Sequence, residues 1–216
     1  MDGVLVNSEQ TWYKYGSEFL NTLFGKNVLA KMGELIGITI DEEYELATSY
    51  GFRMSKDEFY RRYDEQALGM YSKSIITQNI DSLLQTLKNM GYKIALVSAS
   101  RKLWIDQVLQ RISSKDLFDY VLSLNGRVDL KPKPHPDGYT EAIKILSASP
   151  QKTIILEDSN RGIAASKAAG AFTIAYTQHL VPGYVQVEAD AKAKNVYEVL
   201  KIVKKFERVL KHFGNK

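Results

Sequence analysis

The chain opens with Met1-Asp2-Gly3-Val4-Leu5-Val6-Asn7-Ser8-Glu9, in which an Asp-Gly pair precedes a short apolar run. Three later segments also bring polar side chains together, and they read VSAS at 97–100, KPHPD at 133–137 and LEDSNRG at 156–162. The first and third of these follow apolar runs that are typical of buried strands. In open parallel sheets ligands bind at the carboxyl ends of the strands, so these segments hold the first candidates for a functional site.

From about residue 80 onward, helix and strand patterns alternate. This alternation predicts an α/β fold with a Rossmann-like core, in which a parallel sheet carries helices on both faces. Glycine or proline marks several of the boundaries between elements. Helices are expected over 80–90, 103–112, 136–146, 161–169 and 195–212, and strands over 93–97, 120–124, 153–156 and 172–176.

Between about residues 12 and 76 the pattern is helical and carries little strand signal. We therefore expect residues 12–76 to form a helical cap domain that is inserted into the core. The core itself would comprise residues 1–11 and 77–216. Within the cap, helices are expected over 44–50, 56–68 and 70–76, with Gly51 and Gly69 between them.

The composition is that of a globular chain, with 44% hydrophobic residues, 25% charged residues and no cysteine. The absence of cysteine excludes disulfide and thiolate chemistry and fits a reducing compartment, so we expect a cytoplasmic protein. No apolar run approaches the roughly 18 residues that a membrane span needs.

The net charge of +4 is concentrated near the end of the sequence, where residues 192–216 hold eight basic and two acidic residues. A basic tail can bind nucleic acid or a membrane surface. Apolar residues, however, recur in this tail at helical spacing, and Phe206 lies on that stripe rather than among the lysines. An amphipathic helix packed on the core is therefore favoured, and we expect neither nucleic acid nor a membrane as a partner.

The polar residues at the expected strand ends form a chemically coherent set. Ser98 follows one strand, and Glu157 and Asp158 follow another, while Lys133 and Asp2 lie in neighbouring loops. Carboxylates suit a hard cation such as Mg²⁺, and a lysine with a hydroxyl suits phosphate oxygens. Each segment alone is more often a turn, a helix cap or a surface lysine. Together, their order and placement favour a site for phosphoryl chemistry.

With these segments in this order, the chain resembles the haloacid dehalogenase-like superfamily, and in particular its β-phosphoglucomutase-like branch. The family's opening motif resembles Phe-Asp-x-Asp-Gly-Val-Leu-x-Asp-Ser-Glu, which residues 2–9 match from the second aspartate onward, with Asn7 at a position that is often Asp. The second motif is matched by Ser98-Ala99-Ser100, the third by Lys133 and the fourth by Glu157-Asp158-Ser159. The resemblance covers nearly the whole chain, including the inserted cap.

The resemblance implies a role for each matched residue. Asp2 would act as the general acid that protonates the leaving oxygen and then as the base that activates water. Gly3 would let the backbone pass close to the site, and the cap would close over the substrate. The catalytic residues would be Asp2, Ser98 and Lys133; the phosphate would be held by Ser98, Ala99 and Lys133, and Mg²⁺ by Asp2, Glu157 and Asp158.

The family's nucleophilic aspartate lies two residues before the acid/base aspartate, at a position that precedes Met1. Three explanations of the absent nucleophile stay open. Met1 is an internal methionine that was taken as the start, or the chain was shortened, or the protein is a non-catalytic relative of the family. We expect the first strand and the nucleophile to be missing from the 216-residue polypeptide. That polypeptide should then show little turnover, because loss of a covalent nucleophile can cost on the order of 10⁶ in rate.

Mutases of this branch resemble phosphatases but carry cap residues that hold a second phosphate. The stretch 36–43 has no arginine and is acidic, where a second phosphate would need cations. We therefore expect a Mg²⁺-dependent phosphatase that acts on a small phosphomonoester such as a sugar phosphate, as a monomer or weak homodimer. The alternatives are a β-phosphoglucomutase-type phosphomutase and a non-catalytic binder of phosphorylated ligands. In each case the partner would be a small phosphorylated metabolite.

Overall fold

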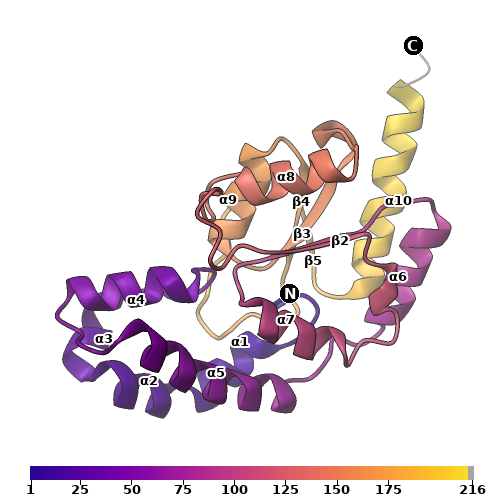
Figure 1. The fold of residues 1–216 in the computed structure, drawn as a ribbon. Coiled ribbons are helices and arrows are strands. Elements are labelled where there is room, and N and C mark those ends of the chain that lie inside the picture. Colours follow the sequence, from indigo (N-terminus) through magenta and orange to yellow (C-terminus); the bar gives the residue numbers. More distant parts are fainter. Residues whose placement is uncertain (214–216) are drawn as a thin grey trace.

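The computed structural model describes residues 1–213, so the last three residues of the expected core lie outside the description. Figure 1 shows two parts, an all-helical unit and an α/β part that holds every named strand of the described chain. The helical unit, residues 8–73, consists of α1 (Ser8–Tyr15), α2 (Ser17–Phe24), α3 (Lys26–Met32), α4 (Ile40–Ser49) and α5 (Lys56–Lys73).

The α/β part follows the predicted alternation closely. Its helices are α6 (Ile80–Asn89), α7 (Lys102–Leu109), α8 (Asp137–Ile145), α9 (Asn160–Ala168) and α10 (Val196–Phe213), with short 3₁₀ turns at Lys115–Leu117 and Pro150–Lys152. Its strands are β1 (Ala95–Ser98), β2 (Tyr120–Ser123), β3 (Ile154–Glu157), β4 (Phe172–Tyr176) and β5 (Ala191–Ala193). The three-residue β5 was not predicted, because so short a run has no detectable periodicity.

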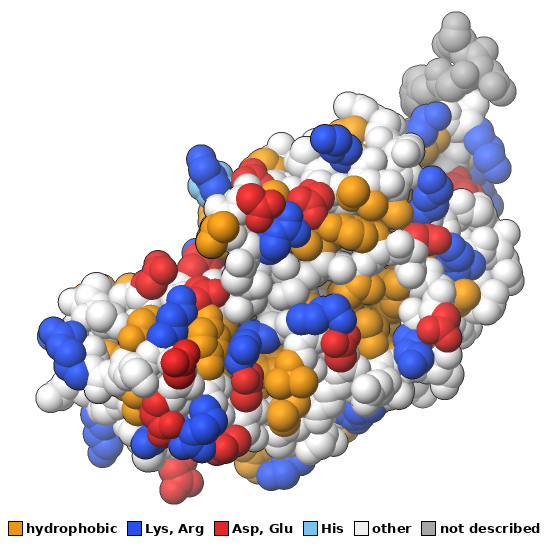
Figure 2. Space-filling model, viewed as in Figure 1, with side chains coloured by type: hydrophobic (Ala, Val, Ile, Leu, Met, Phe, Trp, Pro, Cys, Tyr) orange, Lys and Arg blue, Asp and Glu red, His pale blue; other side chains and the backbone are white. Residues whose placement is uncertain are grey.

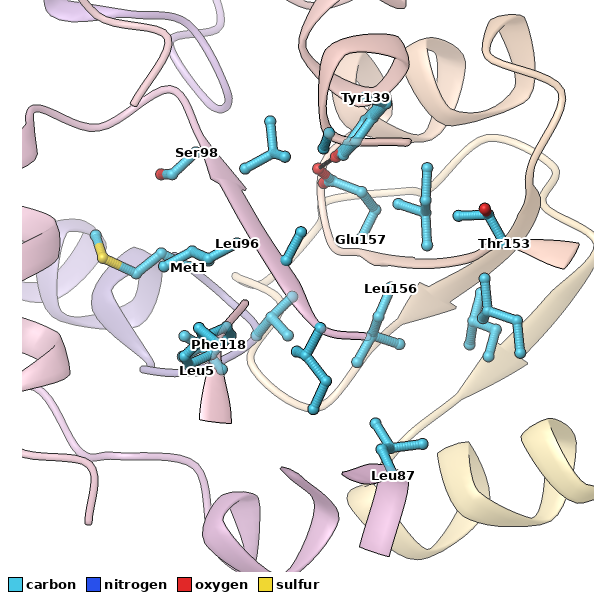
Figure 3. A pocket seen from close by; sticks show the side chains of 18 of the residues that line it. Met1, Leu5, Leu87, Leu96, Ser98, Phe118, Tyr139, Thr153, Leu156 and Glu157 are labelled. Atoms are coloured by element: carbon cyan, nitrogen blue, oxygen red, sulfur yellow. Dashed lines mark hydrogen bonds between the residues drawn. The ribbon is translucent and has the colours of Figure 1, made fainter. Parts of the chain in front are cut away.

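All strand pairs are parallel, as predicted, but the strands form two sheets rather than one. β1 pairs with β2, and β3, β4 and β5 pair in that order. A cavity of about 700 Å³ lies between β1 and β3, and side chains of α6, α8 and α10 also line it. Figure 3 shows Leu96 and Leu156 along this cavity, with Leu87 near one end. The sheet is therefore divided at its middle by an apolar space.

The boundary predicted at Gly69 is wrong, because α5 continues through it to Lys73. Glycine inside a helix costs about 1 kcal/mol relative to alanine. Met70 and Tyr71, in the following turn, are 3% and 2% exposed and extend the buried stripe of Tyr63. Burial of these two side chains outweighs the local cost, since a large apolar side chain contributes about 1.5–3 kcal/mol when buried.

The helical unit joins the α/β part where the chain enters and leaves it. Val6 pairs with Ile76 in an isolated bridge, and the amide of Thr77 donates to the carbonyl of Leu5 at 2.9 Å. Away from this junction, Tyr63 of α5 stacks on Trp104 of α7, with ring centroids 5.7 Å apart. The helical unit is thus held beside the carboxyl ends of β1 and β3.

Candidate active site

Glu157 and Lys133 form a buried ion pair where β3 ends. The Lys133 ammonium donates a hydrogen bond to Oε1 of Glu157, and the two side chains are 7% and 6% exposed. The hydroxyl of Tyr139, on α8, donates to the same oxygen. Burial opposes ionisation of Glu157, but the Lys133 ammonium holds the pKa of that carboxyl below its usual value. Glu157 is therefore ionised at neutral pH.

The turn after β3 directs the second oxygen of Glu157 into hydrogen bonds as well. Oε2 accepts from the amide of Asp158 at 3.2 Å and from the hydroxyl of Ser159 at 3.1 Å. Ser159 also caps α9 by accepting from the amide of Gly162 at 3.0 Å. A Cβ on Gly162 would stand 2.1 Å from the Glu157 carboxylate, so this close approach requires glycine.

The carboxylate of Asp158 differs from that of Glu157 in its hydrogen bonding. It is 9% exposed, and within residues 1–213 no donor makes a hydrogen bond to its side-chain oxygens. Burial, followed by the negative charge of Glu157, raises the pKa of Asp158 to about 7. Its Oδ2 lies against the backbone of Gly3, which has φ +61°, and a Cβ there would stand only 1.8 Å away. Gly3 thus lets the first turn of the chain reach this carboxylate.

Three hydroxyl groups from separate parts of the chain hold the carboxylate of Asp2. Its Oδ1 accepts from Ser8 at 2.6 Å and from Tyr71 at 2.9 Å, and its Oδ2 accepts from Ser100 at 2.6 Å. Ser8 belongs to α1, Tyr71 to α5 and Ser100 to the loop after β1. Both oxygens therefore have a fixed orientation, and two of the three donors, Ser8 and Tyr71, come from the helical unit.

Ser98 ends β1 and is 4% exposed. Its hydroxyl oxygen accepts from the amide of Ser100 at 3.1 Å, which is the contact that a simple cap of the next turn would make. Figure 3 places Ser98 at the same end of the cavity as Glu157 and Tyr139. Ala99 lines that cavity too.

All the residues that the sequence selected meet in one place. Asp2, Ser98, Ala99, Lys133, Glu157 and Asp158 all line the cavity between β1 and β3. Charges on Glu157, Asp2 and Lys133 all act on the pKa of Asp158, so these groups are electrostatic neighbours. The α-amino group of Met1 is buried beside them, and burial lowers its pKa.

This donor set can be compared with what a hard divalent cation requires. Asp158 fits, because a buried carboxylate without hydrogen-bond donors and beside other carboxylates needs a positive partner. Asp2 is the other residue that the family resemblance predicts to hold the cation together with Asp158. Glu157 fits less well as a direct ligand, since both its oxygens already accept hydrogen bonds. Within the described residues no group of three acidic, histidine or cysteine side chains forms a ready-made cage, and Mg²⁺ commonly keeps waters and uses few protein ligands.

Sequence reasoning missed the two tyrosines of the site. The hydroxyl of Tyr71 contacts Asp2, and that of Tyr139 contacts Glu157. Burial and the neighbouring carboxylates raise the pKa of both hydroxyls well above the usual value, so both stay protonated donors. Tyr139 lies six residues after Lys133 in sequence, which is a weak signal, whereas nothing in the sequence connects Tyr71 with Asp2.

Polar contacts also link the helical unit to the α/β part around the site. Arg161 of α9 pairs with Glu42 of α4 at 2.5 Å, and Arg101 pairs with Asp64 of α5. Sequence analysis alone does not assign Arg101 a partner, and here its guanidinium also lies 4.2 Å from the ring centroid of Tyr60. The site is therefore covered on one side by helices whose acidic residues engage both arginines.

The model of the haloacid dehalogenase-like hydrolase family matches residues 1–176, most of the chain. The chain belongs to this family. The predicted haloacid dehalogenase-like membership and α/β fold are thereby confirmed. The match includes the segments that contain Asp2, Ser98, Lys133 and Asp158.

Individual haloacid dehalogenase-like relatives share the fold at low sequence identity. The pyrophosphatase PpaX of Bacillus cereus is 25% identical over 185 residues, which cover 81% of this chain and 79% of its own. A predicted phosphoglycolate phosphatase of Haemophilus somnus has a TM-score of 0.69 at 21% identity, over 94% of both chains. The β-phosphoglucomutase of Clostridium difficile has a TM-score of 0.67 at 23% identity, over 97% of this chain and 95% of its own. Within residues 1–213 no helix is long and apolar enough to span a membrane.

Proposed function

We propose that this site hydrolyses a small phosphomonoester, such as a sugar phosphate, with the help of Mg²⁺. The observation that carries the proposal is the gathering of Lys133, Asp158 and Asp2 at one end of the cavity, beside the buried hydroxyl of Ser98. A lysine, a hydroxyl and an unpaired carboxylate beside an oriented one are the parts that phosphoryl transfer uses for positioning and charge neutralisation.

Each residue has a task in this proposal. Lys133, Ser98 and the amide of Ala99 hold the oxygens of the transferring phosphoryl group. Asp2 gives a proton to the leaving oxygen and takes one from water, and its hydroxyl neighbours keep the carboxyl aimed at that oxygen. Asp158 and the Asp2 carbonyl hold the cation, which neutralises phosphate charge, while Glu157 keeps Lys133 in place.

We also propose that residues 12–76 act as a cap on a core of residues 1–11 and 77–216. The ion pair between Arg161 and Glu42, and the Tyr71 hydroxyl on Asp2, support a cap that contacts the site when closed. Closure of such a cap would exclude water other than the attacking molecule and would complete the set of donors around Asp2.

Two alternative functions make different demands on the cap. A phosphomutase needs cations for a second phosphate, whereas the first turn of α4, which Arg161 contacts through Glu42, is acidic. A non-catalytic binder needs only the phosphate cradle. We propose hydrolysis because Asp2 is oriented by three hydroxyls, which simple phosphate binding does not require.

Phosphate binding and turnover test the proposal separately. Calorimetry should detect Mg²⁺-dependent binding of inorganic phosphate, which is lost in Lys133→Ala and kept in Lys131→Ala, a change at an exposed lysine of the same loop. Phosphate release from a panel of phosphomonoesters should be slow with the 216-residue polypeptide and should depend on Asp2. Phosphate binding that ignores both Mg²⁺ and Lys133 would overturn the proposed site.

A further inference from the structure

The proposed mechanism gives no task to Tyr139, although this side chain lies at the phosphoryl site. Tyr139 belongs to α8, lines the cavity and is 7% exposed. Figure 3 shows it at the same end of the cavity as Ser98, with its hydroxyl directed at Glu157. A phenyl ring alone would fill the same apolar space, so the buried hydroxyl calls for an explanation in terms of its polar partner.

Both ends of the Tyr139 side chain contact the buried ion pair of Lys133 and Glu157. The hydroxyl donates to Oε1 of Glu157, which is the same oxygen that accepts from the Lys133 ammonium. The centroid of the Tyr139 ring lies 5.0 Å from the ammonium nitrogen, within the range of a cation–π contact. One side chain therefore helps to place both the carboxylate and the ammonium.

A phosphate at this site has to compete with Glu157 for the ammonium of Lys133. The hydrogen bond to Glu157 uses one of the three N–H donors of the ammonium, and the other donors are the ones that phosphate oxygens require. The Tyr139 hydroxyl shares the negative charge of Oε1 with the ammonium. Without that hydroxyl the ammonium alone would balance this oxygen, and Glu157 would compete more strongly with phosphate.

Burial distinguishes this arrangement from the ion pairs on the surface. Figure 2 shows acidic and basic side chains interleaved over the outer surface of the helical unit, where Arg61 pairs with Glu58. Such exposed pairs contribute little, because water and salt screen them. Lys133 and Glu157, by contrast, are 7% and 6% exposed, so each hydrogen bond at Oε1 has a larger effect on the ammonium.

We propose that Tyr139 is a positioning residue for phosphate binding, which acts through Glu157 and keeps the Lys133 ammonium available to the phosphate. This inference rests on the proposed function, because it concerns the same phosphate site. Tyr139 does not itself contact the phosphate in this proposal. Its hydroxyl fixes the carboxylate, and its ring lies beside the ammonium that the carboxylate holds.

Tyr139→Phe isolates the contribution of the hydroxyl, because it keeps the ring and removes the donor. Calorimetry with inorganic phosphate and Mg²⁺ at neutral pH measures the dissociation constant without any turnover. We expect phosphate to bind about tenfold more weakly to this variant, a difference of about 1.4 kcal/mol. Tyr139→Leu removes the ring as well and should bind phosphate more weakly than Tyr139→Phe. Circular dichroism verifies that each variant is folded.

The chain offers a matched control, in which a tyrosine, a glutamate and a cation meet outside the site. Tyr120 donates to Oε1 of Glu141 at 2.6 Å, and Arg127 pairs with the same carboxylate at 2.9 Å. Tyr120→Phe removes an equivalent hydrogen bond and should leave the affinity for phosphate within about twofold of wild type. Ile143→Val loosens the packing of α8, the helix of Tyr139, and should likewise leave the affinity within about twofold.

The outcomes separate this inference from the function on which it rests. If wild type binds phosphate and Tyr139→Phe binds it equally well, the positioning role is wrong and the phosphatase proposal stands. An equal loss of affinity in Tyr139→Phe and Ile143→Val would show that Tyr139 only supports the packing of α8, and would overturn this proposal as well. If wild type does not bind phosphate, the proposed function and this inference both fail.

Discussion

The carboxylates of Glu157, Asp2 and Asp158 lie in one site but have different neighbours, and these neighbours determine the chemistry of each carboxylate. Glu157 is ionised beside Lys133, and Asp2 is oriented by hydroxyl groups. Asp158 is buried, and its side chain accepts no hydrogen bond from any donor within residues 1–213. The sequence identified all three from their positions at strand ends. It could not assign these separate environments, because each depends on neighbours from other elements.

Lys133 gives the first prediction at the scale of a residue. Lys133→Met keeps the apolar stem but leaves Glu157 buried without its cation. Breaking a buried pair by removing one partner costs about 3–5 kcal/mol, so the free energy of unfolding should fall by about that amount. Urea denaturation measures it, with Lys131→Met as the exposed control expected to change stability by less than about 0.5 kcal/mol. A loss below about 1 kcal/mol for Lys133→Met would contradict the buried pair.

Glu43 gives a pH-dependent prediction. Burial raises the pKa of Glu43 from 4.5 to about 8, so the folded protein binds a proton that the unfolded chain releases. The contribution of this group to stability is therefore present below pH 4.5 and is lost as the pH rises toward 8. Each unit of pKa difference corresponds to about 1.4 kcal/mol.

Glu43→Gln should accordingly reduce the fall in stability between about pH 5 and pH 8, when measured by urea denaturation at several pH values. The pKa values of Glu9 and Asp158 are raised as well, so both carboxyls contribute in the same direction. Both remain in the variant, and the difference between the two curves therefore reports on Glu43. Glu45→Gln should reproduce the wild-type curve. Parallel curves for wild type and Glu43→Gln would refute the assignment.

At the scale of the element, glycines serve opposite purposes in this chain. Gly69 lies inside α5, where a Cβ would meet no atom within 4 Å. Gly3 lies in the first turn, where positive φ and the Asp158 carboxylate both exclude a side chain. Sequence reasoning predicted the close approach at Gly3 but took Gly69 for a helix end. A glycine indicates only local backbone freedom, and it does not reveal whether the residues on either side of it are buried.

The same substitution should therefore change stability in opposite directions at these two glycines. Gly69→Ala should raise the free energy of unfolding by about 0.5–1 kcal/mol, because alanine is the better helix former. Gly3→Ala should lower it by about 1–3 kcal/mol from backbone strain alone, and should also displace Asp158. Thermal and urea unfolding of the two variants measure both effects. A destabilised Gly69→Ala would mean that α5 is interrupted after all.

At the scale of the whole molecule, the division between two sheets is the most unusual feature. Parallel sheets are normally buried on both faces and continuous. Here the facing edges of β1 and β3 border a cavity of about 700 Å³ whose walls are mostly apolar. Neighbouring strands lie about 4.8 Å apart, and a single extended strand could pair with both edges. The two sheets of the described chain have the geometry of one sheet opened at its centre.

An extended apolar peptide added in trans should therefore stabilise the 216-residue polypeptide. A ligand that binds only the folded state raises the midpoint of thermal unfolding as its concentration increases. A peptide of the same composition with a central proline should not do so, because proline cannot donate to the ladder. Differential scanning fluorimetry with both peptides is the measurement. Equal shifts, or none, would show that the cavity does not accept a strand.

The sequence by itself determined the order of helices and strands after residue 80 and the family motifs around Asp2, Ser98, Lys133 and Asp158. It could do so because periodicity, strand ends and motif spacing are local properties that short stretches of chain carry. Only the tertiary structure decided that Tyr71 contacts Asp2, that Glu43 is buried beside Tyr63, and that the sheet is divided. Those relations join residues far apart in the chain, and they depend on how whole elements pack, which no spacing along the sequence encodes.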